Sequence, residues 1–140
     1  MNLLAILLNV LWIVAGGGIA GVMFWAIAGL LLAITIIGLP FAIAAFRMAR
    51  FALLPFGQKL VPAEAMGERR VPGTALANIL WFILAGVWLW IYHVVVGIFL
   101  CLTIIGIPFG IANFKLASVS LRPLGRRAIL HDQLMPVVER

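Results

Sequence analysis

Two long apolar blocks alternate with two polar segments along this chain. No Lys, Arg, Asp or Glu occurs in residues 1–46 or 71–114, and basic residues follow closely after each block. An uncharged apolar stretch longer than about 18 residues predicts a membrane-embedded segment, and about 20 helical residues cross a hydrocarbon core. Each block is long enough for two such segments. The pattern therefore predicts an all-α membrane protein with four membrane-embedded helical segments.

The two blocks are copies of one unit. The stretch TIIGLPFAIAAF at residues 35–46 recurs as TIIGIPFGIANF at residues 103–114, and NVLW at 9–12 matches NILW at 78–81. Gly, Pro and Thr align as well as the apolar residues, so apolar composition alone does not produce the match. The predicted organisation is a first repeat at residues 1–60, a cytoplasmic linker at 61–73, a second repeat at 74–127 and a polar tail at 128–140.

A Gly-x-Pro phrase marks a predicted helix break in each copy. Gly commonly ends a helix in a left-handed conformation, and Pro suits the first turn of the next helix. The Thr before each Gly is expected to bond a backbone carbonyl freed at the break; lining a pathway is the other interpretation. The candidate break residues are Thr35, Gly38 and Pro40 in the first copy and Thr103, Gly106 and Pro108 in the second.

A stripe of small residues at helical spacing follows each break. Small residues let helices approach closely in lipid, so the stripe is a candidate contact face toward partner helices. If the break lies at the interface, the segment after it is an amphipathic helix on the membrane surface; if it lies deeper, paired breaks indicate a transport site. The stripe comprises Ala42, Ala45, Ala49 and Ala52, matched by Gly110, Asn113, Ala117 and Ser120.

The net charge of +6 comes from basic residues that follow the apolar blocks. This position is typical of the cytoplasmic side of a membrane protein and argues against a nucleic-acid patch. An even number of crossings per repeat puts both basic ends on one side, so both termini are expected in the cytoplasm. Candidate contacts to lipid phosphates are Arg47, Arg50, Lys115 and Arg122.

Few polar side chains interrupt the apolar blocks. Asn9, Asn78 and Asn113 are expected to hydrogen-bond between helices, with a pathway role as the alternative. His93 lies beside aromatic residues 88, 90 and 92, and this cluster is expected at a hairpin tip in the membrane interface. Asn2 and Thr74 are the candidate N-caps of the first and third segments.

The second copy, NILWFILAGVWLWIYHVVVGIFLCLTIIGIPFGIANFKLASVSLRPLGRR, and its weaker first copy resemble the YccF family of small bacterial inner-membrane proteins. The resemblance covers nearly the whole chain, and GIPFGIANFKLA is its most specific motif. It implies an inner-membrane location and a multi-pass helical fold. It implies no activity, substrate or catalytic residue.

The sequence offers little for catalysis. No carboxylate occurs in either apolar block, and the lone Cys101 has no second ligand nearby, so we expect no enzyme, metal or cofactor. The main hypothesis is a structural or interaction module that contacts the lipid bilayer and either further copies of itself or other membrane proteins. The alternative is an oligomeric channel or transporter-like conduit for a small ion or solute.

Overall fold

A computed structural model describes residues 2–15, 17–69 and 71–131. Each repeat contributes three helices followed by one strand. In the first repeat these are α1 (Leu3–Ala15), α2 (Gly18–Ala33), α3 (Leu39–Leu53) and β1 (Gln58–Pro62). In the second they are α4 (Thr74–Trp81), α5 (Val87–Cys101), α6 (Ile107–Ser120) and β2 (Arg126–Leu130), with a π-helical turn, Phe82–Gly86, joining α4 to α5.

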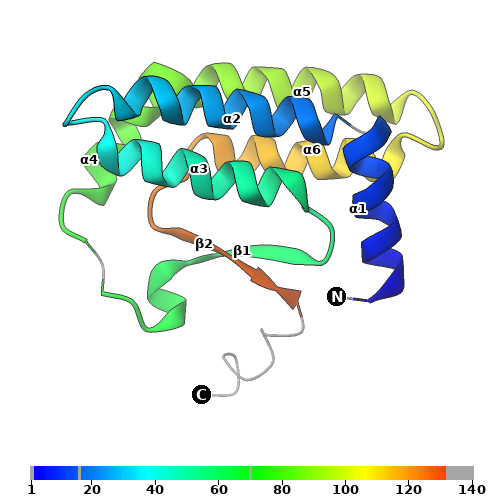
Figure 1. The fold of residues 1–140 in the computed structure, drawn as a ribbon, viewed down its shortest axis with the longest axis horizontal. Coiled ribbons are helices and arrows are strands. Elements are labelled where there is room, and N and C mark those ends of the chain that lie inside the picture. Colours follow the sequence, from blue (N-terminus) through cyan, green and yellow to red (C-terminus); the bar gives the residue numbers. More distant parts are fainter. Residues whose placement is uncertain (1, 16, 70, 132–140) are drawn as a thin grey trace.

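The elements form three layers (Figure 1). Helices α2 and α5 make one outer layer, α3 and α6 pack beneath them, and the two strands lie on the far side of α3 and α6. Helix α1 at one end and α4 at the other connect the strand side to the α2/α5 layer. The stretch Thr74–Cys101 is long and apolar enough to cross a membrane, and α1 with α2 passes the same test only as a pair bent by 74°.

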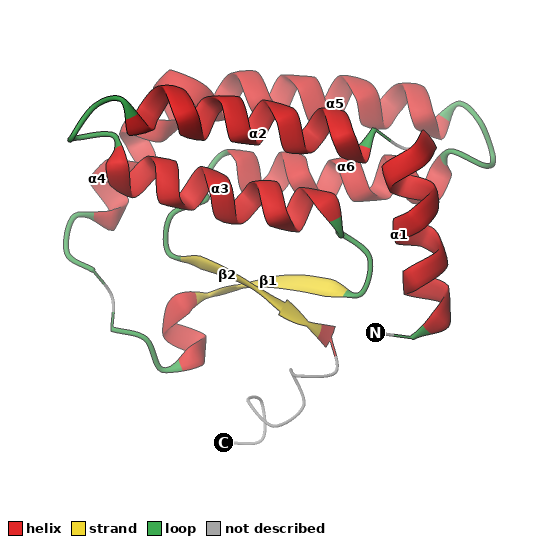
Figure 2. Cartoon of the chain, in the orientation of Figure 1, coloured by secondary structure: helices red, strands yellow, loops and turns green. Residues whose placement is uncertain are grey.

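A two-stranded antiparallel ribbon joins the repeats (Figure 2). Its register pairs Gln58 with Leu130 and Pro62 with Arg126. Gly57 and Gly125, each directly before a strand, have φ of 79° and 77°, a left-handed conformation that favours glycine. The chain is mostly helical, as predicted, but the all-α prediction missed this ribbon, because its short strands form through a pairing between distant residues. The last residues of β1 and the 3₁₀ turn Ala63–Met66 lie within residues 61–73, the predicted linker.

The core lies between the helix pairs and is rich in tryptophan. Trp12, Trp25 and Trp81 are buried, and the rings of Trp25 and Trp81 stack with centroids 5.6 Å apart. The small-residue stripe faces this core, so its predicted role as an outward contact face is wrong: the chain supplies the helices that pack on it. All eight stripe residues, Ala42, Ala45, Ala49, Ala52, Gly110, Asn113, Ala117 and Ser120, are buried.

The Gly-x-Pro breaks form as predicted in one respect and differ in another. Pro40 and Pro108 lie in the first turn of α3 and α6, as expected. Gly38 and Gly106, however, have φ of −77° and −79°, so the predicted left-handed helix end is wrong. A Cβ on Gly38 would lie 2.0 Å from a carbonyl oxygen, that of Leu32. Close approach of the backbone, rather than handedness, accounts for the glycine.

The hairpin tips lie at the breaks themselves. The aromatic cluster with His93 belongs to α5, inside an uninterrupted helical stretch, and His93 is fully buried. The expected interfacial tip at this cluster is therefore wrong. Asn2 caps α1, since the Ala5 N–H donates to Asn2 Oδ1 at 2.9 Å, whereas Gly73 occupies the cap position expected for Thr74.

Candidate functional site

The two break threonines bond to their own backbone. The Thr35 hydroxyl donates to the Leu32 carbonyl at 3.1 Å and accepts the Gly38 N–H at 3.0 Å. Thr103 does the same with the Leu100 carbonyl and the Gly106 N–H, each at 3.1 Å. Each hydroxyl thus satisfies a carbonyl at the end of one helix and an amide at the start of the next. This geometry matches the backbone-bond interpretation and fixes the shape of both tips.

Two asparagines clamp the chain segments that precede the strands. The Asn9 side chain donates to the Phe56 carbonyl and accepts the Phe56 N–H, both at 3.0 Å. Asn78 makes the same pair of bonds with Leu124, at 3.2 and 3.1 Å. Each asparagine ties its first helix to a segment more than 40 residues away. They therefore act within the chain and hold the ribbon against the helices.

The buried tryptophans reinforce the same contacts. Trp12 Nε1 donates to the Ala52 carbonyl at 2.8 Å, and Trp81 Nε1 donates to the Ser120 carbonyl at 2.7 Å. These carbonyls lie near the carboxyl ends of α3 and α6, where the last helical turn leaves carbonyls without a helical partner. The repeated Asn and Trp of the NVLW and NILW stretches thus have one structural role in both copies.

A buried hydrogen-bond chain crosses from one repeat to the other. Trp25 Nε1 donates to His93 Nε2 at 3.3 Å, and His93 Nδ1 lies 3.0 Å from Asn113 Oδ1. Because an indole N–H only donates, Nε2 must accept, so in the neutral imidazole Nδ1 carries the proton and donates to Asn113. Asn113 Nδ2 then donates to the Phe109 carbonyl at 3.1 Å. The structure thus brings two of the predicted polar residues, His93 and Asn113, into one network.

These polar groups together form internal scaffolding. Among the residues that the structure describes, no buried side-chain nitrogen or oxygen lacks a hydrogen-bond partner. A buried polar network that is fully paired rigidifies a core and specifies one arrangement of it. The four predicted packing or pathway residues, Asn9, Asn78, His93 and Asn113, all form hydrogen bonds within this chain.

The predicted lipid-phosphate residues lie near the ribbon, but in separate places. Arg47 and Arg50 of α3 line a cavity of about 430 Å³ together with Arg126 and Arg127 of β2. Arg127 also forms an ion pair with Glu68. The ribbon side therefore carries concave basic surface, while the outer faces of α2 and α5 are apolar.

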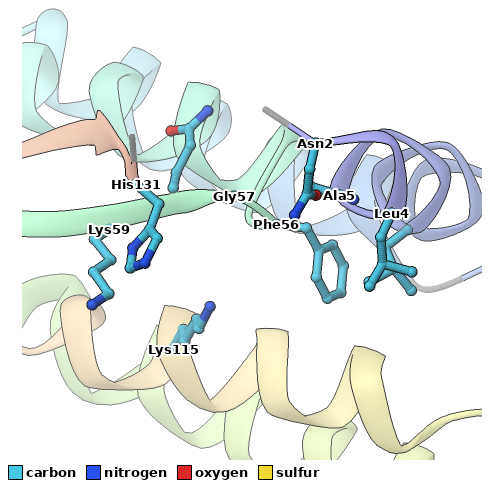
Figure 3. Close-up of a pocket in the computed structure, with 10 residues that line it drawn as sticks. Asn2, Leu4, Ala5, Phe56, Gly57, Lys59, Lys115 and His131 are labelled. Carbon is cyan, nitrogen blue, oxygen red and sulfur yellow. Dashed lines mark hydrogen bonds between the residues drawn. The ribbon is translucent and has the colours of Figure 1, made fainter. Parts of the chain in front are cut away.

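Lys115 and Arg122, on or just after α6, face two further cavities. Arg122 lines one of about 570 Å³ whose wall includes Glu64. Lys115 lines one of about 660 Å³ with Lys59 and His131 (Figure 3). The sequence did not single out Lys59 or His131 as site residues. Only the strand pairing, continued by the bond from the His131 N–H to the Gly57 carbonyl at 3.0 Å, brings them together.

Comparison with known proteins agrees with the repeat. A family model described as YccF, an inner membrane component domain, matches residues 7–58 and again residues 76–126. The inner membrane protein YccF of Escherichia coli (strain K12) is 37% identical over 128 residues, which cover 87% of this chain and 85% of that protein. The same values hold for the inner membrane protein YccF of Shigella flexneri. No solved structure matches the chain. The duplicated break, the paired Asn-x-x-Trp clamps and these matches establish that the chain belongs to the YccF family of inner membrane components.

Proposed function

We propose that this protein is a structural and interaction module of the inner membrane, without catalytic activity, whose two repeats enter the bilayer from the side that carries the ribbon. Both termini then lie on that side, in the cytoplasm. The apolar outer faces of α1, α2 and α5 contact lipid and neighbouring membrane proteins or further copies. The distribution of apolar and basic side chains over the surface supports this placement.

The hairpin tips carry the most exposed apolar side chains of the described chain. Ile36 is 87% exposed and Ile104 is 88% exposed, and the two tips lie at opposite ends of the helix layers (Figure 1). Burying an isoleucine is worth about 1.5–3 kcal/mol relative to leaving it in water. Both tips are therefore suited to hydrocarbon, which requires α2 and α5 to lie along the bilayer plane within the apolar region.

A multi-pass arrangement in which α2, α3, α5 and α6 cross the bilayer fits less well. It would put the two isoleucine tips in opposite headgroup regions. It would also put Arg47, an exposed residue near the middle of the 15-residue helix α3, close to the bilayer centre. A lipid-facing arginine there costs at least about 2.5–3.5 kcal/mol. Entry from the ribbon side instead leaves Arg47 and Arg50 near headgroups, where the positive-inside bias favours the cytoplasm.

The buried polar groups are hydrogen-bonded within the chain, and this observation favours a module over a conduit. A conduit needs polar groups that face water along its path. In this chain the hydroxyls of Thr35 and Thr103 bond to backbone, and His93 bonds to Trp25 and Asn113. The cavities described above open near the ribbon, away from the α2/α5 layer. A single copy thus offers rigid scaffolding in its apolar part and concave basic surface at its cytoplasmic side.

Cysteine labelling tests the placement. In a Cys101→Ser background, we expect Ser118→Cys, exposed on α6 beside Lys115, to react with a membrane-impermeant thiol reagent only from the cytoplasmic side. We expect Ile36→Cys and Ile104→Cys to react from neither side. Reaction of the two tip cysteines from opposite sides would show a crossing arrangement and refute entry from one side.

Flux through liposomes tests the module against the conduit. We expect purified protein to give no ion or small-solute flux above that of empty liposomes. The matched variant replaces both Gly106 and Pro108 with Leu. Flux in the unaltered protein that this variant abolishes, while it remains folded by its tryptophan fluorescence, would show that the repeated phrase belongs to a conduit.

A further inference from the structure

We infer that the cavity formed by Lys59, Lys115 and His131 binds the phosphate headgroup of one anionic phospholipid of the cytoplasmic leaflet. The inference rests on the proposed membrane placement and assigns a ligand class to one site within it. The cavity has a volume of about 660 Å³ and is bounded by the start of α1, the segment before β1, the ribbon and α6.

The cavity has a basic end and an apolar end (Figure 3). Lys59, Lys115 and His131 gather at one end, while Leu4 and Phe56 lie at the other. No Asp or Glu lines it among the described residues. Two lysine ammonium groups in a cavity whose described lining carries no carboxylate favour a phosphate, which Lys binds as a point charge. The apolar end favours a ligand whose phosphate is joined to hydrocarbon.

Hydrogen bonds fix the walls of this cavity before any ligand binds. Asn9 holds both backbone groups of Phe56 at 3.0 Å, which fixes the segment before β1 against α1. The His131 N–H donates to the Gly57 carbonyl, which extends the ribbon and brings His131 beside Lys59. A preformed site loses less conformational entropy on binding than a mobile one.

The apolar end is continuous with the surface that the proposed placement puts in lipid. Leu4 is 64% exposed, and Leu7 and Leu11 continue the exposed apolar face along α1. A phospholipid with its phosphate between Lys59 and Lys115 can run its acyl chains along this face. A free anion would use only the basic end and leave the apolar wall in water.

The corresponding region of the second repeat differs in charge. The cavity of about 570 Å³ that Arg122 and Arg126 line also has Glu64 in its wall, and a carboxylate disfavours a bound phosphate by like-charge repulsion. The two repeats share a scaffold, but we assign the lipid to the cavity of Lys59 and Lys115 alone. This asymmetry supplies a matched control, because neutralising Arg122 removes similar charge without touching the assigned site.

The test measures binding of phosphatidylglycerol and phosphatidylethanolamine to the full chain in detergent by native mass spectrometry. The site variant is Lys59→Gln with Lys115→Gln; the control variant, Arg69→Gln with Arg122→Gln, changes the net charge equally. With about 1 kcal/mol per basic residue near lipid, the site variant is expected to bind phosphatidylglycerol roughly 25-fold more weakly. The control is expected to lose no more than about threefold, because separated exposed charges are screened.

The lipid site is refuted by any of the following results. Equal loss in the two double variants, or equal binding of the two lipids by the unaltered protein, would overturn a specific headgroup site. Displacement of phosphatidylglycerol by inorganic phosphate at comparable concentration would show a free-anion site instead. Alkaline carbonate extraction of the unaltered protein from membranes tests the embedding separately. Release of the protein would refute the proposed membrane placement. Retention of the protein, together with unchanged lipid binding in the site variant, would refute only the lipid site.

Discussion

Replacing Gly38 with Ala is expected to destabilise the protein through a clash of atoms and not through backbone conformation. The φ of Gly38 is −77°, which alanine adopts without strain. A Cβ at this position would lie 2.0 Å from the Leu32 carbonyl oxygen and 2.5 Å from Thr35 Oγ1. Ordinary contacts begin at 3.4 Å, so the carbonyl must move by about 1.4 Å, the difference between the two distances.

That movement removes existing bonds. The Leu32 carbonyl accepts hydrogen bonds from the Thr35 N–H and the Thr35 hydroxyl, both at 3.1 Å. Each is worth about 0.5–1.5 kcal/mol net, and overpacking adds about 1–3 kcal/mol. The lower entropy of the unfolded alanine chain offsets about 0.4–1 kcal/mol. Gly38→Ala is therefore expected to lower the free energy of unfolding by about 2–5 kcal/mol, and Gly106→Ala, with its Cβ 2.1 Å from the Leu100 carbonyl oxygen, by a similar amount.

The matched control is the same substitution at Gly21 in the interior of α2. A Cβ there would lie 3.7 Å from His93 and 3.8 Å from Ala52, which are ordinary contacts. Gly21→Ala is expected to raise the free energy of unfolding by about 0.5–1 kcal/mol, because alanine is the better helix former. Urea unfolding in detergent micelles, followed by tryptophan fluorescence, measures all three variants. Gly38→Ala at or above the stability of the unaltered protein would refute the close-approach explanation.

Two further predictions concern the buried polar network. Asn9→Ala removes both bonds to Phe56 and is expected to lower the free energy of unfolding by about 2–4 kcal/mol. Asn78→Ala is expected to lower it by roughly half as much, because water reaches the half-buried Asn78. Equal losses for the two variants in the same urea assay would contradict this reasoning. His93→Leu leaves the Trp25 N–H and the Asn113 oxygen without their partner, and it is expected to lower the free energy of unfolding by about 2–4 kcal/mol. The tryptophan emission is expected to broaden without a blue shift. An unchanged urea midpoint would show that His93 does not hold the network.

Much of the local structure was predictable because it depends on neighbouring residues. Pro40 and Pro108 begin helices since a proline needs no N–H partner in the first turn. Thr35 and Thr103 bond to carbonyls three residues earlier, and Asn2 caps the helix that follows it. The apolar blocks and the duplication also required only composition and alignment of the chain with itself. The helices, their breaks and the family resemblance could therefore be predicted from the sequence.

The incorrect predictions concern contacts between distant residues. A small-residue stripe indicates close packing but does not say whether the partner helix belongs to the same chain, and here Ala45 and Asn113 pack inside it. His93 stands among aromatic residues that suit an interface, yet its partner is Trp25, 68 positions away in the sequence. The left-handed glycine was the usual explanation for a helix end, whereas at Gly38 a carbonyl leaves no room for a Cβ.

The apolar blocks, the duplication and the positions of the helix breaks can all be read from the amino-acid sequence, because hydrophobic length and turn chemistry act over a few residues. Contacts between distant residues set which polar groups are internal and which line a cavity. The ribbon pairs Gln58 with Leu130 and thereby brings Lys59, Lys115 and His131 to one cavity. Such a site depends on the pairing of residues about 70 positions apart, and no local pattern of hydrophobic and polar residues encodes that pairing.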